Sequence, residues 1–442
     1  MQALLDPPAS FRWAPYLLVA FVALLPLVGP AETALSLGAI VALTMLLWQR
    51  FRGGTRLMRR EAWALSTVLF FAYWLPQAIS AIDAVDARHA WKEVLTDLRY
   101  LPFLWLATMA VSSERGRKFC LGGVAIIVLL WTVDGLGQAL TGWSFLAWAL
   151  DHLLMWIRVH WEHAETGAGL GGQETADRLS GVFGAGNLKL GIVLASLSPF
   201  ALAWARERGG AWLWTLVAVL VGTVILLAGS RAAWLTYGLV LVFSGWQTYR
   251  SKRLMALLAL AGLLIATLSW FGSDNFRERI TRSVTAVQGD RFDVDHALSW
   301  RLSVWTTAGR MIAAHPINGV GARGFRYAYR QYASPNDPFL QGDQTGAFHA
   351  HQIVLEILSE TGLIGLMLWL AGAALAWRAW NWASEQARQR AGPAALALAV
   401  TVFPFNTHLA FYSNFWGGIF LLLVALYAGT LLAQEPSDAP AA

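Results

Sequence analysis

Two histidines, His349 and His351, stand at the start of an apolar segment that runs on to Trp380. A neutral imidazole can take a proton at physiological pH, so a histidine in this place suits a general base that activates a hydroxyl group. The segment is long enough to cross a bilayer, yet Glu356 and Glu360 lie within its first three turns. Ionisable groups are expensive in hydrocarbon and face a polar interior or pair with one another. We therefore expect His351 to do chemistry at the membrane boundary, with the two glutamates as buried structural groups.

Arginine is the second residue type with chemical potential in this chain. The stretch 272–351 holds nine arginines and no lysine. The planar guanidinium binds phosphate through two parallel hydrogen bonds, which lysine cannot do. A base together with such arginines indicates transfer from a lipid-linked phosphate, in which the arginines hold the diphosphate as its charge develops. The alternative is that each arginine pairs with an acidic residue of the same stretch or contacts lipid head groups.

Arg231 differs from these arginines in how tightly it is tethered. It lies in A-G-S-R-A-A-W (228–234), in a turn of a few residues between two apolar runs. A side chain held so close to the membrane rim has little freedom to move into solvent, which favours a fixed binding role. The alternative is an arginine that reaches from the helix end to the lipid head groups.

Metal and nucleotide chemistry have little support in the sequence. The acid-rich stretch 289–296 does not have the spacing of an EF-hand loop, and H-A-H (349–351) alone is a thin zinc motif. The chain also lacks a P-loop, a G-x-S-x-G elbow and a G-x-G-x-x-G motif between a strand and a helix. We expect no bound metal and no cofactor.

The elements that position these residues are membrane helices. Hydrophobic residues make up 57% of the 442-residue chain and charged residues only 14%, whereas soluble domains contain about 25% charged residues. Apolar runs close to the length of a membrane span recur along the chain. We predict an all-α, polytopic integral membrane protein with about twelve transmembrane helices, at 14–29, 32–49, 61–81, 98–112, 119–141, 184–205, 211–229, 232–248, 254–271, 352–377, 394–411 and 414–433.

The charge pattern predicts the orientation of these spans. The net charge is +6, but basic clusters such as those at 50–60 and 249–253 lie between apolar runs. This is the positive-inside pattern, which places both termini in the cytoplasm and calls for no nucleic-acid partner. The run 14–29 lacks a convincing cleavage site, so we predict a retained first span. The single cysteine, Cys120, excludes an intrachain disulfide.

Three segments are then predicted to face the outer side: a short polar loop at 82–97, a longer loop at 142–183, and a large, mostly helical loop domain at 272–351. The loop domain divides the chain into residues 1–271, with nine helices, and residues 352–442, with three. Within it, Ser299–Ala314 carries an apolar stripe at helical spacing. Such a stripe is typical of a helix that lies at the membrane interface.

Several motifs connect these residues to a known family. His351-Gln352 is followed by nine residues and then by Gly362-Leu363-Ile364-Gly365. Three further stretches are R-L-S-G-V-F-G-A-G-N (178–187), G-S-R-A (229–232), and R-L-S-V-W with H-P-I-N-G-V-G-A-R-G-F (within 301–325). In these motifs, in its number of spans and in its large outer loop, the chain resembles the bacterial O-antigen ligase/polymerase superfamily. The resemblance covers about 178–380.

The resemblance implies a metal-independent, inverting membrane glycosyltransferase of the GT-C-like kind. Such a ligase moves O-antigen polysaccharide from undecaprenyl diphosphate to a sugar hydroxyl of the lipid A core, at the periplasmic face of the bacterial inner membrane. By the matching motif positions, His351 is the general base, and Arg231 and Arg301 bind the diphosphate. Further candidates for substrate binding are His349, Gln352, Arg323, Arg178, Asn187 and Lys189.

Other functions stay open at this stage. An O-antigen polymerase typically has two arginine-rich outer loops, whereas 142–183 holds only Arg158 and Arg178. Protein-glycosylating members carry an extra C-terminal region, and here the chain ends within ten residues of the last predicted span. A transporter or flippase for a lipid-linked glycan would show inverted repeats or broken helices, and the sequence predicts neither. The oligomeric state, the acceptor sugar and the O-antigen are also open.

Overall fold

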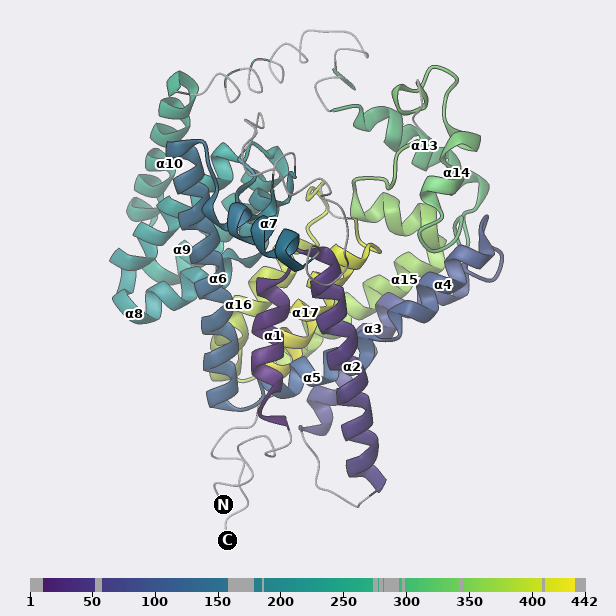
Figure 1. The fold of residues 1–442 in the computed structure, drawn as a ribbon, viewed down its shortest axis with the longest axis horizontal. Helices are drawn as coiled ribbons and strands as arrows, with labels where there is room; N and C mark the ends of the chain where they lie inside the picture. Colours follow the sequence, from purple (N-terminus) through teal and green to yellow (C-terminus); the bar gives the residue numbers. More distant parts are fainter. Residues whose placement is uncertain are drawn as a thin grey trace. The chain divides into compact units, whose positions relative to one another are not determined.

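The computed structural model describes residues 11–51, 58–157, 179–184, 187–272, 299–341, 346–407 and 410–433, together with residues 277, 281, 294 and 295. Every regular element in these ranges is a helix, which confirms the all-α prediction for the described part of the chain. The helices belong to two compact units, and each unit is described by itself below (Figure 1).

The first unit comprises residues 1–21, 28–120 and 286–442. It holds most of α1 (Ala14–Ala23), then α2 (Val28–Phe51), α3 (Arg60–Ser80), α4 (Ala87–Asp97), α5 (Tyr100–Ala110), α13 (Arg301–Ala314), α14 (Phe325–Tyr332), η5 (Pro338–Leu340), α15 (Ile353–Trp382), α16 (Glu385–Thr401) and α17 (Asn414–Leu431). The second unit comprises residues 22–27 and 121–285. It holds most of α6 (Glu114–Thr141), then α7 (Phe145–Ile157), η4 (Gly181–Phe183), α8 (Lys189–Leu227), α9 (Arg231–Tyr249) and α10 (Lys252–Gly272).

Six helices of the described residues are long and apolar enough to cross a membrane, namely α2, α3, α6, α8, α15 and α17. The protein is therefore a multi-pass membrane protein. Helix α8 consists of two helices that meet at Gly209 and Gly210, whose backbone angles are not helical, so it covers two of the predicted spans. The remaining predicted runs overlap α1, α5, α9, α10 and α16, and the run 394–411 is wrong in its second half, because α16 is Glu385–Thr401. The count of twelve spans stays a prediction.

Helix α17 is the most buried helix of the first unit. Every residue from Phe415 to Leu431 is buried, as expected for a helix that is apolar on all sides. It packs against α3, α5 and α16. Close approach depends on Gly417, because a side chain at this position would overlap the hydroxyl group of Tyr73 on α3.

The apolar stripe of α13 is covered by the protein itself. Val304, Ala308 and Met311 are fully buried in a core that they share with α14, Ala347 and Ala350. The prediction that this stripe faces the membrane interface is therefore wrong. The small side chains at 308, 347 and 350 allow α14 and the chain around the histidines to pack directly on α13, so that the protein itself covers this stripe.

The predicted polar loop at 82–97 contains helix α4, which the sequence did not predict. The Asp86 side chain accepts a hydrogen bond of 3.0 Å from the backbone N–H of His89 and so caps the helix. Ala90, Val94 and Asp97 are buried at helical spacing. The charged residues between them hide this short periodicity in the sequence.

Helix α15 is interrupted at Gly362, where φ is +65° and ψ is −164°. A side chain at this glycine would overlap the carbonyl group of Ile317, because the loop after α13 packs directly against the break. A left-handed φ favours glycine, which has no Cβ to clash. The prediction that no helix is broken is thus wrong for α15, and the motif glycine marks the position of the break.

Candidate active site

The histidine loop, residues 346–352, is fixed by contacts on both sides of each histidine. Ala347 and Ala350 are buried in the core with α13 and α14. The indole N–H of Trp305 on α13 donates a hydrogen bond of 3.1 Å to the carbonyl oxygen of Ala350. Gln352 ends the loop as the N-cap of α15, and its side-chain oxygen accepts from the Leu355 N–H at 2.6 Å. The sequence did not predict this capping role.

His351 is held as a neutral imidazole. Burial, and after it the nearby positive charge of Arg301, lower its pKa from 6.5 to about 4. Its backbone has a left-handed φ of +54°. Among the described residues, its Nδ1 has no hydrogen-bond partner. The ring of His349 lies against it, with ring centroids 3.9 Å apart and an angle of 50° between the planes.

Arg301 begins helix α13, and the structure brings it beside His351. The Asp295 carboxylate caps this helix by accepting from the backbone N–H groups of Leu302 at 2.7 Å and Ser303 at 3.2 Å. The guanidinium of Arg301 donates a long hydrogen bond of 3.5 Å to the carbonyl oxygen of Thr407. The backbone of Thr407 also interacts with the His351 ring and favours its protonated form. Two of the residues proposed from the sequence therefore converge on Thr407.

Sequence reasoning missed the chain between α16 and α17, residues 402–413. The sequence predicted a span that runs to 411, whereas α16 ends at Thr401. Besides Thr407, this chain supplies the backbone N–H of Tyr412, which donates to the Glu356 carboxylate at 3.2 Å. The available signal was N-T-H (406–408), a polar tripeptide near the end of an apolar run.

The two glutamates of α15 are buried and have polar neighbours. Glu356 and Glu360 are each only 2% exposed. Glu356 accepts the hydrogen bond from Tyr412, and Glu360 accepts one of 2.9 Å from the backbone N–H of Arg323. The guanidinium of Arg323 pairs with Glu93 on α4 at 2.7 Å. None of these hydrogen bonds links Glu356 or Glu360 to His351.

In the second unit, the candidate residues lie where two helices begin. Arg231 is the first residue of α9 and Lys189 the first residue of α8. The side chain of Asn187 accepts from the Lys189 N–H at 3.2 Å. A Cβ at Gly191 would come within 3.0 Å of the Ala228 side chain, so the start of α8 packs against the turn before α9. Arg178 lies outside the described residues.

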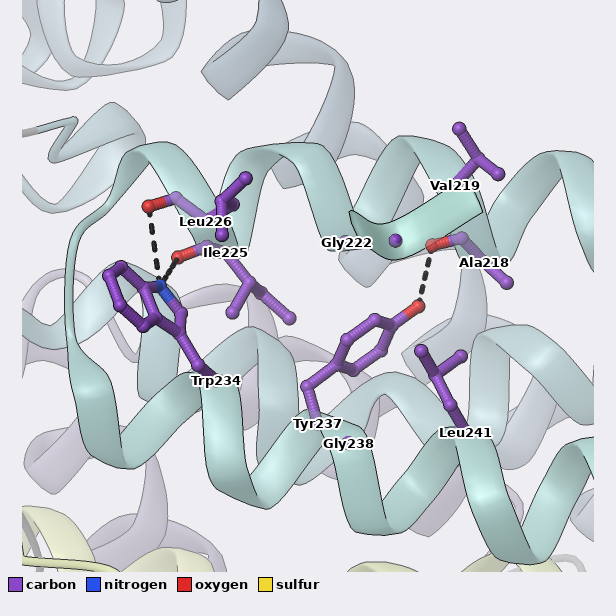
Figure 2. Close-up of a pocket in the computed structure, with 10 residues that line it drawn as sticks. Ala218, Val219, Gly222, Ile225, Leu226, Trp234, Tyr237, Gly238 and Leu241 are labelled. Atoms are coloured by element: carbon purple, nitrogen blue, oxygen red, sulfur yellow. Dashed lines mark hydrogen bonds between the residues drawn. The ribbon is translucent and has the colours of Figure 1, made fainter. Parts of the chain in front are cut away.

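Helices α8 and α9, with Gly262 of α10, line an open apolar pocket of about 220 Å³ in the same unit. It is lined by residues that include Trp234 and Tyr237 of α9, which lie one to two turns from Arg231. Figure 2 shows both side chains reaching from α9 to α8. Tyr237 donates to the carbonyl of Ala218 at 2.7 Å, and Trp234 donates to that of Ile225 at 3.1 Å. With their polar atoms engaged, these rings present apolar faces to the pocket.

The first unit thus holds the elements of acid–base catalysis. A neutral imidazole can accept a proton, and the adjacent guanidinium can bind an anionic leaving group. Within the described ranges, no group of three or more His, Cys, Asp or Glu side chains is arranged to hold a metal ion. His351 and Arg301 can supply proton transfer and anion stabilisation.

Comparison with known proteins connects this site to a family. Residues 216–370 match the family model described as O-antigen ligase, and this range contains Arg231, Arg301 and His351. The chain is also 24% identical over 317 residues to the exopolysaccharide production protein ExoQ of Rhizobium meliloti (strain 1021). The aligned region covers 69% of this chain and 68% of that protein. These matches confirm the resemblance to the O-antigen ligase/polymerase superfamily and support a membrane glycosyltransferase of the ligase/polymerase type.

Proposed function

We propose that this protein is an O-antigen ligase. It transfers O-antigen polysaccharide from undecaprenyl diphosphate to a sugar hydroxyl of the lipid A core, at the periplasmic face of the bacterial inner membrane. The observation that carries the proposal is the neutral His351 beside Arg301, inside the range that matches the O-antigen ligase family model. Membrane lipids surround the protein, and the reaction calls for neither a metal nor a cofactor.

In this reaction, His351 takes the proton of the acceptor hydroxyl as the oxygen attacks the anomeric carbon of the donor. The bond between that carbon and the diphosphate breaks, and the configuration at the carbon inverts. A base with a pKa of about 4 is fully available at neutral pH. It suits a late proton transfer, because the hydroxyl becomes strongly acidic as its oxygen bonds to carbon.

The cationic groups act on the leaving diphosphate. Arg301 binds it beside the base, and Arg231 binds it from the start of α9. Lys189 and Asn187 begin the neighbouring helix, where backbone N–H groups and the helix dipole also favour an anion. The apolar pocket near Arg231 suits the isoprenoid chain of such a donor. Arg178 stays a predicted donor-binding residue, and His349 and Gln352 stay predicted contacts for substrate.

Replacing His351 or Arg231 with Ala tests this function in cells. We expect polymer to stay on undecaprenyl diphosphate and the core lipid to stay unmodified. A matched control is Arg330→Ala, because Arg330 is an exposed arginine of the same outer segment as Arg301. This control should give normal polymer-capped lipopolysaccharide on a gel. Normal capping by well-expressed His351→Ala protein would contradict the proposal.

A second candidate is a polymerase that extends a glycan on its lipid carrier. The similarity to a protein named for exopolysaccharide production favours it. The base and the arginines would act in the same way, but the acceptor would be a lipid-linked repeat unit. Loss of a polymerase leaves one repeat unit on the core, whereas loss of a ligase leaves a bare core. One gel of the deletion strain distinguishes them.

A further inference from the structure

The break in α15 is closed by another part of the chain, the loop 316–323 that follows α13. The loop runs beside the break and supplies the hydrogen bonds that a continuous helix would have made. Four backbone bonds of 2.8 to 3.1 Å join them: Val320 N–H to Ser359 C=O, Gly321 N–H to Glu360 C=O, Leu363 N–H to Pro316 C=O, and Ile364 N–H to Ile317 C=O. Buried backbone groups left without partners would be costly, so the loop and the break are parts of one structure.

The carboxylate of Glu360 holds the end of this loop. It accepts a hydrogen bond of 2.9 Å from the backbone N–H of Arg323 and also faces the backbone N–H of Phe325. Arg323 has a left-handed φ of +52°, which costs a residue other than glycine about 1 kcal/mol. The hydrogen bond that the Arg323 N–H donates to the Glu360 carboxylate offsets this cost. The conformation of the loop therefore depends on a buried carboxylate of α15.

The side chain of Arg323 fastens the same loop to α4. Its guanidinium donates to the Glu93 carboxylate at 2.7 Å and lies 3.4 Å from the Asn414 side-chain oxygen. Burial opposes its charge, but Glu93 and Glu360 outweigh burial and raise the Arg323 pKa. The two side chains are only 17% and 13% exposed. The guanidinium is thus engaged by protein groups that neutralise it.

This assembly joins the elements that carry the catalytic residues. The loop continues directly from α13, whose first residue is Arg301, while α15 begins next to His351. Figure 1 shows α4, α14 and α15 in one region of the first unit. A shift of the loop along the break would move α13 relative to the histidine loop, and so Arg301 relative to His351. Displacements of about 1 Å can cost about a hundredfold in rate.

We propose that Arg323, Glu93 and Glu360 are positioning residues, which lock the loop 316–323 into the broken helix and thereby set Arg301 against His351. This inference rests on the proposed glycosyl transfer. It gives Arg323 a role that differs from the substrate contact expected from the sequence, since its guanidinium binds Glu93. We call the loop 316–323, seated in the break of α15 at Gly362, the joint.

A double-mutant cycle on Glu93 and Arg323 tests the joint in the purified full-length protein. Each single change, Glu93→Gln or Arg323→Gln, leaves one buried charge without its partner. We expect each to lower kcat by about ten- to a hundredfold, to change the donor KM little, and to lower the melting temperature. The double variant removes both charges, so it should recover most of the lost kcat and melting temperature.

Other outcomes overturn the proposal. If Arg323 binds the diphosphate directly, Arg323→Gln raises the donor KM and Glu93→Gln does not rescue it. Arg323→Lys supplies a second test, because lysine keeps the positive charge for Glu93 but loses the planar fork. The joint predicts near-normal kcat for this variant, whereas bidentate phosphate binding predicts a large loss.

The melting temperatures separate failure of the joint from failure of the proposed function. The recovery of the melting temperature in the double variant needs no substrate, so it can be measured whatever the reaction is. If the recovery occurs but His351→Ala still transfers glycan normally, the joint stands and the proposed function falls. If the decreases in melting temperature of the two single variants add up in the double variant, Glu93 and Arg323 are not coupled and the proposed joint is wrong.

Discussion

At the scale of single residues, the site depends on a histidine that stays neutral. A protonated His351 would be both largely desolvated and placed beside the cation of Arg301, and each effect disfavours the charged form. The burial comes from the histidine loop, which packs on α13 through Ala347 and Ala350. The same packing brings the base and the guanidinium together. Tuning of the base and its placement thus have one structural cause.

The pH dependence of transfer should report this tuning. His351 acts only when neutral, and its pKa is about 4. The rate should therefore stay flat as the pH falls from 8 through 6.5, the ordinary histidine value, and decline only as the pH approaches 4. The measurement is kcat of the purified protein across this range. A decline centred near 6.5 would show that His351 is not shielded as described.

Arg301→Gln should move this acidic limb in a defined direction. Removing the positive charge removes one of the two effects that lower the His351 pKa. The pKa then rises, so the rate declines at a higher pH than in the unmodified protein. The loss of Arg301 also lowers the rate at neutral pH. Each rate is therefore divided by the rate of the same variant at neutral pH, and the pH at which this ratio falls to one half is compared. Arg301→Lys keeps a charge and should leave the limb close to its original position.

At the scale of elements, the break in α15 explains why glycines follow the histidine at a fixed distance. The first helical stretch, between Gln352 and Gly362, sets the separation between the histidine loop and the joint. At Gly362 the chain turns into a left-handed conformation and meets the loop after α13. At Gly365, a side chain would overlap that of Thr361. The number of residues between His351 and Gly362 therefore sets the distance between the histidine loop and the joint.

Gly362→Ala should destabilise the protein and reduce transfer. The left-handed φ of +65° costs an L-residue about 1–2 kcal/mol, and the added methyl group overlaps the Ile317 backbone, which cannot rotate away as a side chain can. We expect a clearly lower melting temperature in detergent. The matched control is Gly309→Ala in α13, where nothing lies within 4 Å. This control should be neutral or stabilising by up to about 1 kcal/mol.

At the scale of the whole molecule, the broken helix raises the question whether the protein is a transporter. Broken helices form ion and substrate sites in transporters because their exposed backbone groups face the transported species. In α15 the freed backbone groups on either side of Gly362 bond to the chain's own loop. The break is therefore filled by protein, and it docks the loop 316–323 on α15.

The orientation of the molecule can be tested with cysteine labelling. The native Cys120 is fully buried, which gives a clean background. Asn336 is exposed after α14, in the segment that is predicted to lie outside, and Gln386 is exposed at the start of α16. In intact spheroplasts, a membrane-impermeant maleimide should label Asn336→Cys and leave Gln386→Cys unlabelled. After permeabilisation both should react. The opposite pattern would place the candidate site in the cytoplasm.

The sequence by itself determined the class of the protein and singled out the residues that are proposed to do the chemistry. Long apolar runs must be helices in a membrane, because only helices satisfy their own backbone hydrogen bonds there. Most predicted runs accordingly coincide with observed helices. The histidine and arginine motifs could also be recognised in the sequence, because their residue types limit the possible chemistry.

Only the tertiary structure decided how these residues work. That His351 is neutral depends on burial by α13 and on the charge of Arg301, which lies 50 positions away along the chain. Glu93 and Thr407 were recognised only through contacts with distant segments, and in the sequence only the polar tripeptide N-T-H (406–408) marks Thr407. The break at Gly362 is stable only because a remote loop supplies its hydrogen bonds. Local patterns specify elements, whereas desolvation, pairing and docking depend on which elements meet.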